Sequence, residues 1–434
     1  MTNGVNTREL ALDTLIEVME HDQYSHLVLR SVLDKYAYLE KQERAFLTRL
    51  VEGTIERTVE LDYVINTYSK VKVKKMKPLI RNLLRMSTYQ LRYMDSVPDP
   101  AVCNEAVKLA KKRGFSQLSG FVNGVLRSMI REPERVKYPD EKKAPVQYLS
   151  VHFSMPEWIV EEWMETYGQE KTKALLQEFE KEQKLIVRTN LNRTTPEALA
   201  EALKKQGITA CQNKDLPYAL ALTGVDQLQM LPEFLAGDFY VQDISSMMVA
   251  ETADVHPGDY VIDVCAAPGG KSTHIAELLN GTGQVEARDL TEYKVGLIQD
   301  NINRHGLSNM QAKVWDATVE DEASKDKADV LICDLPCSGL GVLGKKTDIR
   351  YKMTKEKQQE LVLLQREILM TVRDYVKPGG TLVYSTCTIN YEENEGNVEW
   401  FLDEFPYFSL ESMRQMFPGE LGQDGFFIAK LKRG

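Results

Sequence analysis

The second half of the chain repeatedly places a carboxylate or a thiol directly after a short apolar segment. Five such segments are followed, in order, by the turn 265–271, Asp289, Asp316, Asp334 and Cys387. Cys337 lies close behind Asp334, in the stretch Asp-Leu-Pro-Cys-Ser-Gly. Carboxylates are rarely buried without partners. Three acidic segment ends followed by two thiols therefore indicate a functional site rather than a requirement of packing.

The turn 265–271 joins a predicted buried strand to a predicted helix. Its residues are Cys265, Ala266, Ala267, Pro268, Gly269, Gly270 and Lys271. Paired glycines let a ligand approach the backbone closely, and the helix N-terminus favours an anionic group. The turn matches neither the dinucleotide nor the P-loop pattern, so a carboxylate, such as that of S-adenosylmethionine, suits it as well as a phosphate. An acidic residue about 20 positions beyond such a turn, here Asp289, is placed to hold ribose hydroxyls.

Two thiols at neighbouring strand ends are compatible with three kinds of chemistry. A metal site would need about four ligands, often with histidine. The six histidines form no H-x-x-H or C-x-x-C pattern, so we expect no metal. A redox pair would prefer C-x-x-C. The third possibility is nucleophilic catalysis by a thiolate in the low-dielectric mouth of a cofactor site.

Methylation at C5 of a pyrimidine is the reaction that requires this combination of groups. Addition of a thiolate to C6 turns the ring into an enamine, whose C5 can then attack an S-methyl sulfonium. A carboxylic acid near N3 stabilises the charge on the ring. The C5 proton must then leave and the thiolate be expelled, a step that a second thiol or a water can assist. Spacing alone does not decide whether Cys337 or Cys387 attacks.

Positioning these groups requires a sheet whose strand ends meet at one edge. The strands are expected at 260–264, 284–288, 311–315, 329–333, 381–386 and 426–431, and the helices at 271–280, 291–305, 354–376 and 391–404. This alternation predicts a parallel, doubly wound, Rossmann-like α/β sheet, whose ligands bind beyond the carboxyl ends of the strands.

The front of the chain, residues 7–137, is predicted to be entirely helical, with one long helix at about 40–68. Residues 1–143 hold 25 Lys and Arg against 19 Asp and Glu, whereas the remainder holds 29 against 45. Eight basic and no acidic residues lie between Lys70 and Arg92, beside Tyr68, Tyr89 and Tyr93. A second basic cluster consists of Lys108, Lys111, Lys112 and Arg113. This asymmetry favours contact of the front half with an RNA backbone.

A polar, proline-containing stretch at 132–150 is predicted to be a linker. Ser154 and Glu157 fit a capping box that opens a helix carrying Trp158 and Trp163, both expected in the core. A strand at 185–191, a helix from 195 to 207 and strands near 209–212 and 218–222 predict a small α+β unit. We therefore expect three domains, at 1–140, 150–235 and 236–434.

The composition excludes several classes of protein. The sequence MTNGVNTREL has no apolar signal segment, and no stretch approaches 18 uninterrupted apolar residues. We therefore expect no membrane partner. Six cysteines without a framework spacing are expected to be reduced thiols in a cytoplasmic protein. We expect a monomer.

Four motifs carry a resemblance to a known family. They are Cys-Ala-Ala-Pro-Gly-Gly-Lys at 265–271, Asp-Leu-Pro-Cys-Ser-Gly-Leu-Gly at 334–341, Ser-Thr-Cys-Thr at 385–388 and Asp-Gly-Phe-Phe at 424–427. Together they resemble the RNA cytosine-5 methyltransferases of the Nol1/Nop2/Sun group. The stretches Asn-Glu-Ala-Val-Lys-Leu-Ala-Lys from Asn104 and Phe-Val-Asn-Gly-Val-Leu-Arg at 121–127 resemble the NusB-like RNA-binding domain. The combination is most similar to bacterial members that act on 16S ribosomal RNA.

The resemblance implies roles for individual residues. It implies Cys387 as the nucleophile and Cys337 as the thiol that assists product release. It also implies that the turn 265–271, Asp289, Asp316 and Asp334 bind S-adenosylmethionine, with Asp334 also near the target base. Leu335 departs from the motif, which usually has alanine there, and is expected to point into a tight turn.

Three alternatives to this assignment stay open at this point. DNA cytosine-5 methyltransferases take the nucleophile from the Pro-Cys motif, which here would be Cys337. The same chemistry could also act on transfer RNA or on another RNA. Finally, the chain could be a non-catalytic RNA-binding ribosome assembly factor, although retention of both cysteines and of all three aspartates speaks against this.

Overall fold

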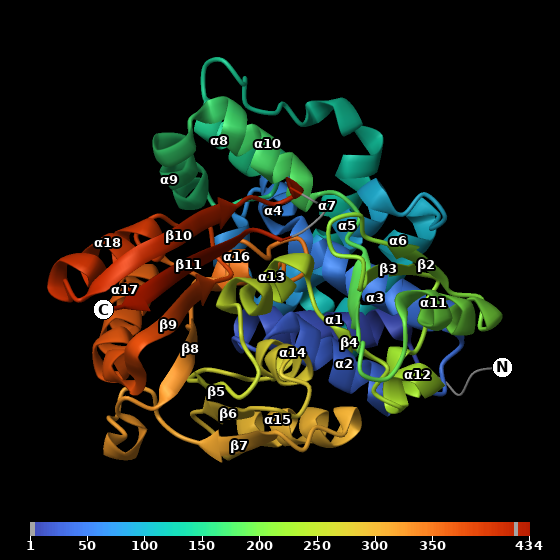
Figure 1. Cartoon of the computed structure of the whole chain (residues 1–434). Coiled ribbons are helices and arrows are strands. Elements are labelled where there is room, and N and C mark those ends of the chain that lie inside the picture. The colour runs from blue at the N-terminus through green and yellow to red at the C-terminus, as the bar shows by residue number, and fades with distance from the viewer. Residues whose placement is uncertain (1–4, 421–423) are drawn as a thin grey trace. The chain divides into compact units, whose positions relative to one another are not determined.

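The computed structural model describes residues 5–420 and 424–434. The chain forms two compact units, one of residues Met1–Glu180 with Lys345–Met353 and one of residues Lys181–Gly344 with Thr354–Gly434 (Figure 1). The three-domain division expected from the sequence stays a prediction.

The first unit is helical, and buried residues between Ala11 and Met129 form one apolar core within it. Its α-helices are α1 (Thr7–Glu20), α2 (Ser25–Lys35), α3 (Lys41–Glu56), α4 (Thr58–Tyr68), α5 (Pro78–Tyr93), α6 (Asp99–Lys112), α7 (Ser119–Arg131), α8 (Pro145–His152), α9 (Glu157–Tyr167), α10 (Gln169–Phe179) and α16 (Ile349–Lys352). Helix α1 shows why they form, because it buries Leu12, Leu15 and Val18 at helical spacing. The prediction of an all-helical front half is confirmed.

The predicted single helix at 40–68 is wrong, and so is the predicted capping box at Ser154. Helices α3 and α4 meet at Arg57, which ends the first and precedes the second. The Ser154 hydroxyl accepts hydrogen bonds from the amides of Val59 at 2.9 Å and Glu60 at 3.3 Å. It therefore caps the start of α4 rather than its own helix α9, which begins after Pro156 without a side-chain cap. A cap supplied from a distant residue cannot be seen in local sequence.

The predicted linker at 132–150 contains helix α8, so that part of the prediction is also wrong. Pro145 occupies the first helical position, where it is tolerated, and Leu149 and Val151 are buried. The side chain of Trp163 is buried, as expected, whereas Trp158 is half-buried.

A short segment from the second half of the chain, residues Lys345–Met353, completes the first unit. The buried Asp348 carboxylate accepts hydrogen bonds from the Ser25 amide at 3.0 Å and the Ser25 hydroxyl at 2.7 Å. The Tyr351 hydroxyl donates to the carbonyl of Glu56 at 2.9 Å or to that of Ser154 at 3.0 Å. The helical unit is therefore incomplete without this segment.

The second unit begins with a small antiparallel sheet in the order β2-β3-β1-β4. Its elements are β1 (Leu185–Thr189), α11 (Pro196–Lys205), β2 (Thr209–Gln212), β3 (Ala219–Thr223), α12 (Pro232–Leu235) and β4 (Phe239–Val241). Val187, Leu220 and Phe239 from three strands pack with Leu199 and Leu203 of α11. The predicted small α+β unit is present, with β4 as an additional strand.

The larger sheet has seven strands in the order β10-β11-β9-β8-β5-β6-β7 (Figure 1). Its elements are α13 (Ile244–Ala253), β5 (Tyr260–Asp263), α14 (Gly270–Leu278), β6 (Gln284–Asp289), α15 (Glu292–His305), β7 (Met310–Val314), β8 (Ala328–Asp334), α17 (Lys355–Val372), β9 (Val376–Thr386), α18 (Glu395–Glu404), β10 (Phe408–Met416) and β11 (Phe426–Arg433). Five strands are parallel, as predicted.

The last two strands are antiparallel to their neighbours, so the expectation of a wholly parallel sheet is wrong there. Strand β10 was not predicted at all. It lies at the sheet edge with mostly exposed, polar side chains between Phe408 and Met416, so it lacks the apolar run that marks a buried strand.

Helices cover both faces of this sheet, which makes it doubly wound. Helices α17 and α18 pack on one face with Leu331, Leu382 and Leu431. Helices α13, α14 and α15 pack on the other face with Val330, Val383 and other strand residues. Successive strand residues alternate between the two cores, as the pleat requires. The predicted Rossmann-like fold is confirmed.

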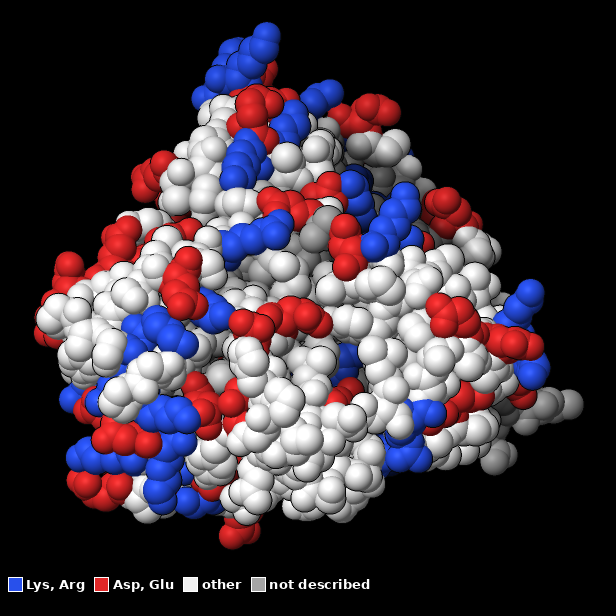
Figure 2. All heavy atoms as spheres, in the orientation of Figure 1, with Lys and Arg blue, Asp and Glu red and all other residues white. Residues whose placement is uncertain are grey.

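Two surface properties bear on function. No described helix is long and apolar enough to cross a membrane. On the face shown in Figure 2, acidic and basic side chains are interspersed rather than gathered by sign.

Candidate active site

The strand order brings the predicted site residues to one edge of the sheet. Strand β8 lies between β5 and β9, and Asp334 at its end pairs in register with Ser385. Strand β6, which ends at Asp289, flanks β5 on the other side. The carboxyl ends of parallel strands share one edge. The turn 265–271, Asp289, Asp334 and both cysteines are thus neighbours.

The turn 265–271, which follows β5, has a backbone conformation that allows a ligand to approach closely. Gly269 has a φ of 105°, a left-handed conformation that favours glycine. The amide of Gly269 donates to the Ala266 carbonyl at 2.7 Å, and helix α14 begins at Gly270. The first amides of a helix have no intrahelical partner and can bind an anion. The turn therefore fits the carboxylate end of S-adenosylmethionine.

Asp289 is buried and faces this turn. Its Oδ2 accepts a hydrogen bond from the Ala267 amide at 2.9 Å, and its Oδ1 accepts one from the Leu290 amide at 2.8 Å. Lys294 lies 2.9 Å from the same carboxylate. These hydrogen bonds fix Asp289, the residue predicted to hold ribose hydroxyls, against the backbone of the turn 265–271.

Asp334 forms an ion pair that sequence analysis missed. Its Oδ2 lies 2.6 Å from Nζ of Lys271, and its Oδ1 accepts a hydrogen bond from the Ser385 hydroxyl at 2.8 Å. The Lys271 ammonium also lies 5.3 Å from the centre of the Phe426 ring, in the fourth motif. Burial opposes the charge on Lys271, but Asp334 together with Asp263 and Cys387 raises its pKa above the usual value.

The two cysteines form a close pair. The sulfur atoms of Cys337 and Cys387 lie 3.3 Å apart, and the Cys387 amide lies 3.3 Å from the Cys337 sulfur. The hydrogen bond to Cys387 and burial raise the pKa of Cys337 well above its usual value. Either sulfur can donate the hydrogen bond between them. Cys387 is also among the groups that raise the pKa of Lys271, which places both residues in one electrostatic environment.

Backbone contacts hold the loops that carry these cysteines. The Gly341 amide donates to the Cys387 carbonyl at 3.1 Å, and the Gly425 amide donates to the Gly341 carbonyl at 2.9 Å. A Cβ at Gly341 would lie 2.1 Å from the Gly425 carbonyl oxygen, so only glycine fits there. The Ser338 amide donates to the buried Glu393 carboxylate at 2.8 Å. Three of the four motifs therefore converge through backbone contacts.

Asp263, at the end of β5, is a further site residue that sequence analysis missed. Its carboxylate is fully buried and accepts a hydrogen bond from the Ser272 hydroxyl at 2.5 Å. Burial raises the pKa of Asp263 to about 7, and the nearby charge of Asp334 acts in the same direction. An acidic residue inside the apolar run Tyr-Val-Ile-Asp-Val was the signal for it.

The remaining predicted residues occupy more peripheral positions. Asp316 follows the edge strand β7 and accepts hydrogen bonds from the Thr318 amide at 2.9 Å and hydroxyl at 2.7 Å. Burial and neighbouring carboxylates raise the pKa of Cys265, so its thiol is not an activated nucleophile. Leu335 is buried in the core with Leu331 and Leu369, so the expectation that it points into a tight turn is wrong.

The basic run of the helical unit divides into two kinds of residue. Arg81, Arg85 and Arg92 form ion pairs with Glu20, Asp62 and Glu60. The five lysines of the α4–α5 connection are exposed, and we call this group the lysine loop: Lys70, Lys72, Lys74, Lys75 and Lys77. Tyr89 is buried in the core and is therefore no stacking platform. Most of the second basic cluster is paired with Glu9, Asp13 and Glu105.

Among residues 5–420 and 424–434, no three His, Cys, Asp or Glu side chains form a group that could hold a metal ion. None of the six cysteines, all of which lie in the part of the chain that the structure describes, forms a disulfide.

Comparison with known proteins gives matches over the whole chain. Family models described as "NusB family", "Methyltr_RsmF/B-like, ferredoxin-like domain" and "16S rRNA methyltransferase RsmB/F" match residues 5–131, 155–227 and 250–432. The protein named "Probable ribosomal RNA small subunit methyltransferase B" in Bacillus subtilis (strain 168) is 36% identical, over 99% of each chain. Its namesake in Synechocystis is 34% identical, over 99% of this chain and 100% of that one. The solved structure titled "Crystal Structure of PH0851" has a TM-score of 0.84 at 25% identity and covers 100% of both chains.

The fold and these matches place the chain in the class of S-adenosylmethionine-dependent methyltransferases that carry a NusB-type front domain. Within this class, similarity over the full length shows that the chain belongs to the family of ribosomal RNA small subunit methyltransferase B. The predicted family resemblance and cofactor are confirmed.

Proposed function

We propose that this protein transfers the methyl group of S-adenosylmethionine to C5 of a cytosine in 16S ribosomal RNA, acting as a monomer in the cytoplasm. The single observation that carries the cytosine-5 chemistry is the Cys337–Cys387 pair, with sulfur atoms 3.3 Å apart beside the Lys271–Asp334 ion pair. The names of the relatives support ribosomal RNA of the small subunit as the substrate.

We assign the nucleophile to Cys387. Its sulfur lies within hydrogen-bond distance of the Cys337 thiol, and the Lys271 ammonium is close enough to interact with it. A neighbouring positive charge and a hydrogen-bond donor both favour a thiolate. The sulfur of Cys387 forms a bond to C6 of the cytosine, which makes C5 nucleophilic. Asp334, which pairs with Lys271 and acts on the pKa of Cys337, is the group that we assign to stabilise the charge on the ring.

When bound, S-adenosylmethionine would supply the electrophilic methyl group that C5 takes up. The turn 265–271, Asp289, Asp316 and Asp334 hold this cofactor in our proposal. The C5 proton then leaves to a water molecule, the electrons of the C5–H bond form the double bond between C5 and C6, and the bond between Cys387 and C6 breaks, which restores the thiolate. The Cys337 thiol, 3.3 Å from the Cys387 sulfur, is placed to donate a hydrogen bond to that sulfur as it departs.

The helical unit is proposed to bind RNA through the lysine loop. Its five exposed lysines lie on one short connection, and none is within ion-pair distance of a carboxylate that the structure describes. Phosphate contacts by such residues give affinity without sequence specificity. The methyltransferase unit would then select the cytosine.

Bisulfite sequencing of ribosomal RNA tests the proposal. RNA from cells lacking this protein is compared with RNA from cells that carry the wild type or Cys387→Ser. We expect one protected cytosine in 16S RNA that appears only with the wild type. A protected site in transfer RNA alone would identify a different substrate, and no protected cytosine in any RNA would contradict C5 methylation.

A further inference from the structure

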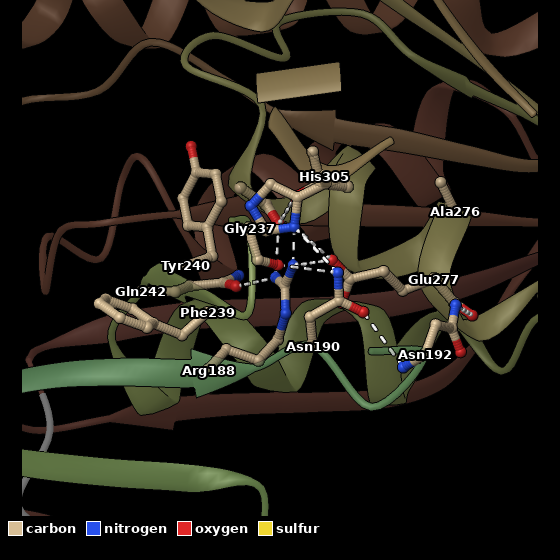
Figure 3. Close-up of polar contacts among 12 residues, drawn as sticks. Arg188, Asn190, Asn192, Gly237, Phe239, Tyr240, Gln242, Ala276, Glu277 and His305 are labelled. Atoms are coloured by element: carbon tan, nitrogen blue, oxygen red, sulfur yellow. Dashed lines mark hydrogen bonds and ion pairs between the residues drawn. The ribbon is translucent and has the colours of Figure 1, made fainter. Parts of the chain in front are cut away.

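One buried arginine of the small antiparallel sheet contacts helix α14, which packs on the larger sheet. Arg188 on β1 is only 1% exposed, and its guanidinium lies among Gln242, Glu277 and His305 (Figure 3). Its Nη1 donates to the Gln242 side chain and, at 2.9 Å, to the carbonyl of Gly270. A buried charge with this many fixed partners is held in one orientation.

Gly270 connects Arg188 to the turn 265–271. It is the first residue of α14 and lies within the turn 265–271. A carbonyl and the amide that follows it share one rigid peptide plane. Fixing the Gly270 carbonyl therefore fixes the direction of the Lys271 amide, one of the helix N-terminal donors without an intrahelical partner.

A second carbonyl of the turn is held in the same way. The Pro268 carbonyl accepts hydrogen bonds from Asn301 at 2.9 Å and from the Tyr240 hydroxyl at 3.4 Å. Tyr240 belongs to β4 of the small sheet, and a Cβ at Gly270 would lie 3.1 Å from its ring. By the same peptide geometry, this contact orients the Gly269 amide, which donates to the Ala266 carbonyl and so stabilises the shape of the turn.

The charge of Arg188 is balanced on the same helix. Its Nη2 lies 3.0 Å from Glu277 and 3.2 Å from the Thr273 hydroxyl. Glu277 in turn lies 3.0 Å from Nδ1 of His305. Arg188 thus contacts α14 from its first residue to its last turn and fixes the position of this helix.

We propose that Arg188 is a positioning residue for the S-adenosylmethionine site and that the small sheet sets the affinity for this cofactor. Arg188 and Tyr240 hold the turn from the side of the small sheet, so the turn's amides are oriented before the ligand arrives. Pre-organisation of this kind raises affinity because less motion is lost on binding. The inference rests on the proposed function, in which this turn holds the cofactor.

Calorimetric titration of the full-length protein with S-adenosylmethionine, without RNA, tests the inference. The principal variant is Arg188→Met with Glu277→Gln, because removing both charges avoids an unpaired buried one. Arg188→Lys is the conservative variant. Asn192→Ala is the matched control, since Asn192 also joins the small sheet to α14 but donates to the Glu277 carbonyl at the far end, at 3.0 Å.

We expect the double variant to bind S-adenosylmethionine about tenfold more weakly, the scale of one missing charge-assisted hydrogen bond. Arg188→Lys should recover part of the affinity, and Asn192→Ala should bind as the wild type does. In steady-state assays the KM for S-adenosylmethionine should rise while the KM for RNA and kcat stay unchanged.

Two results would overturn the inference. One is wild-type cofactor affinity in a folded double variant. The other is a loss of affinity in Asn192→Ala that matches the double variant, which would mean that loosening α14 anywhere has the same effect. Failure of the wild type itself to bind S-adenosylmethionine would instead contradict the proposed function.

Discussion

The sulfur atoms of Cys337 and Cys387 lie 3.3 Å apart although 50 positions separate the residues in the chain. The adjacency of β8 and β9 brings them together, because each cysteine follows the end of one of these parallel strands. The hydrogen bond between them and burial raise the pKa of Cys337. In the proposed mechanism Cys387 is the nucleophile, because the nearby Lys271 ammonium favours a thiolate there, and Cys337 assists.

The Asp289 carboxylate is predicted to contribute to cofactor affinity. Asp289→Ala should weaken binding of S-adenosylmethionine by about 1.5–3 kcal/mol, because two ribose hydroxyls lose a charge-assisted partner. Calorimetric titration measures this. Asp289→Asn should lose less, since it keeps an oxygen that can accept from the Ala267 amide.

Asp300→Ala is the control for this titration, because Asp300 is an exposed acidic residue on the next helix, α15. It should bind as the wild type does. Unchanged affinity in Asp289→Ala would remove Asp289 from the cofactor site.

The lysine loop is predicted to contact RNA phosphates. Reversing four of its charges, at Lys72, Lys74, Lys75 and Lys77, should weaken RNA binding and flatten the dependence of log K on log salt concentration. The slope should fall by about 0.7–0.9 for each phosphate that the variant no longer neutralises, because fewer counterions are released. Binding measured at several salt concentrations gives this slope.

The control for the lysine loop reverses four exposed lysines of the small α+β unit, Lys184, Lys204, Lys205 and Lys214. This variant has the same net charge as the first. Equal slopes in the two variants would show that net charge, and not the lysine loop, determines RNA binding. Cofactor affinity should be unchanged in both.

The buried carboxyl of Asp263 is predicted to make stability depend on pH. Its pKa of about 7 lies above the usual value of 3.8, so the folded protein binds this proton more tightly than the unfolded chain does. The resulting stabilisation is present at low pH and is lost as the pH rises through about 7. The difference in unfolding free energy between wild type and Asp263→Asn should therefore fall from pH 5 to pH 7, by about 1.4 kcal/mol per pH unit, and level off above pH 7.

Chemical denaturation at several pH values measures this difference. Asp300→Asn, an exposed replacement, should show no such trend. A difference between wild type and Asp263→Asn that stays constant from pH 5 to pH 8 would mean that Asp263 is ionised in the folded protein throughout.

Local sequence predicted the elements that bury apolar residues at regular spacing. Strand β5, the turn and α14 were predicted because an apolar run, paired glycines and a helical pattern follow one another there. Strand β10 was missed because an exposed edge strand has no apolar pattern. Helices α3 and α4 were joined because the cap that separates them, Ser154, lies far away in the chain.

The sequence showed that the site residues follow the ends of strands, but it did not show which residues they contact. Strand β8 follows β7 along the chain, yet it lies beside β5 in the sheet. The Lys271–Asp334 pair depends on this order, and so does the contact of Arg188 with Gly270 across two sheets. Contacts of this kind depend on tertiary topology, which local patterns do not encode.

The division of roles between the two cysteines is the central claim. Cys387→Ala should abolish both methyl transfer and any covalent adduct with RNA, because no thiolate remains to attack C6. Cys337→Ala should still form the adduct and transfer the methyl group, but it should release product slowly, because the assisting thiol is missing. The adduct would then accumulate.

A denaturing gel tests this most directly. Each single variant and the wild type are incubated with S-adenosylmethionine and substrate RNA, and the protein is followed for a band that migrates with covalently bound RNA. We predict a stable shifted band for Cys337→Ala and none for Cys387→Ala. A shifted band for Cys387→Ala with none for Cys337→Ala would contradict the account and make Cys337 the nucleophile.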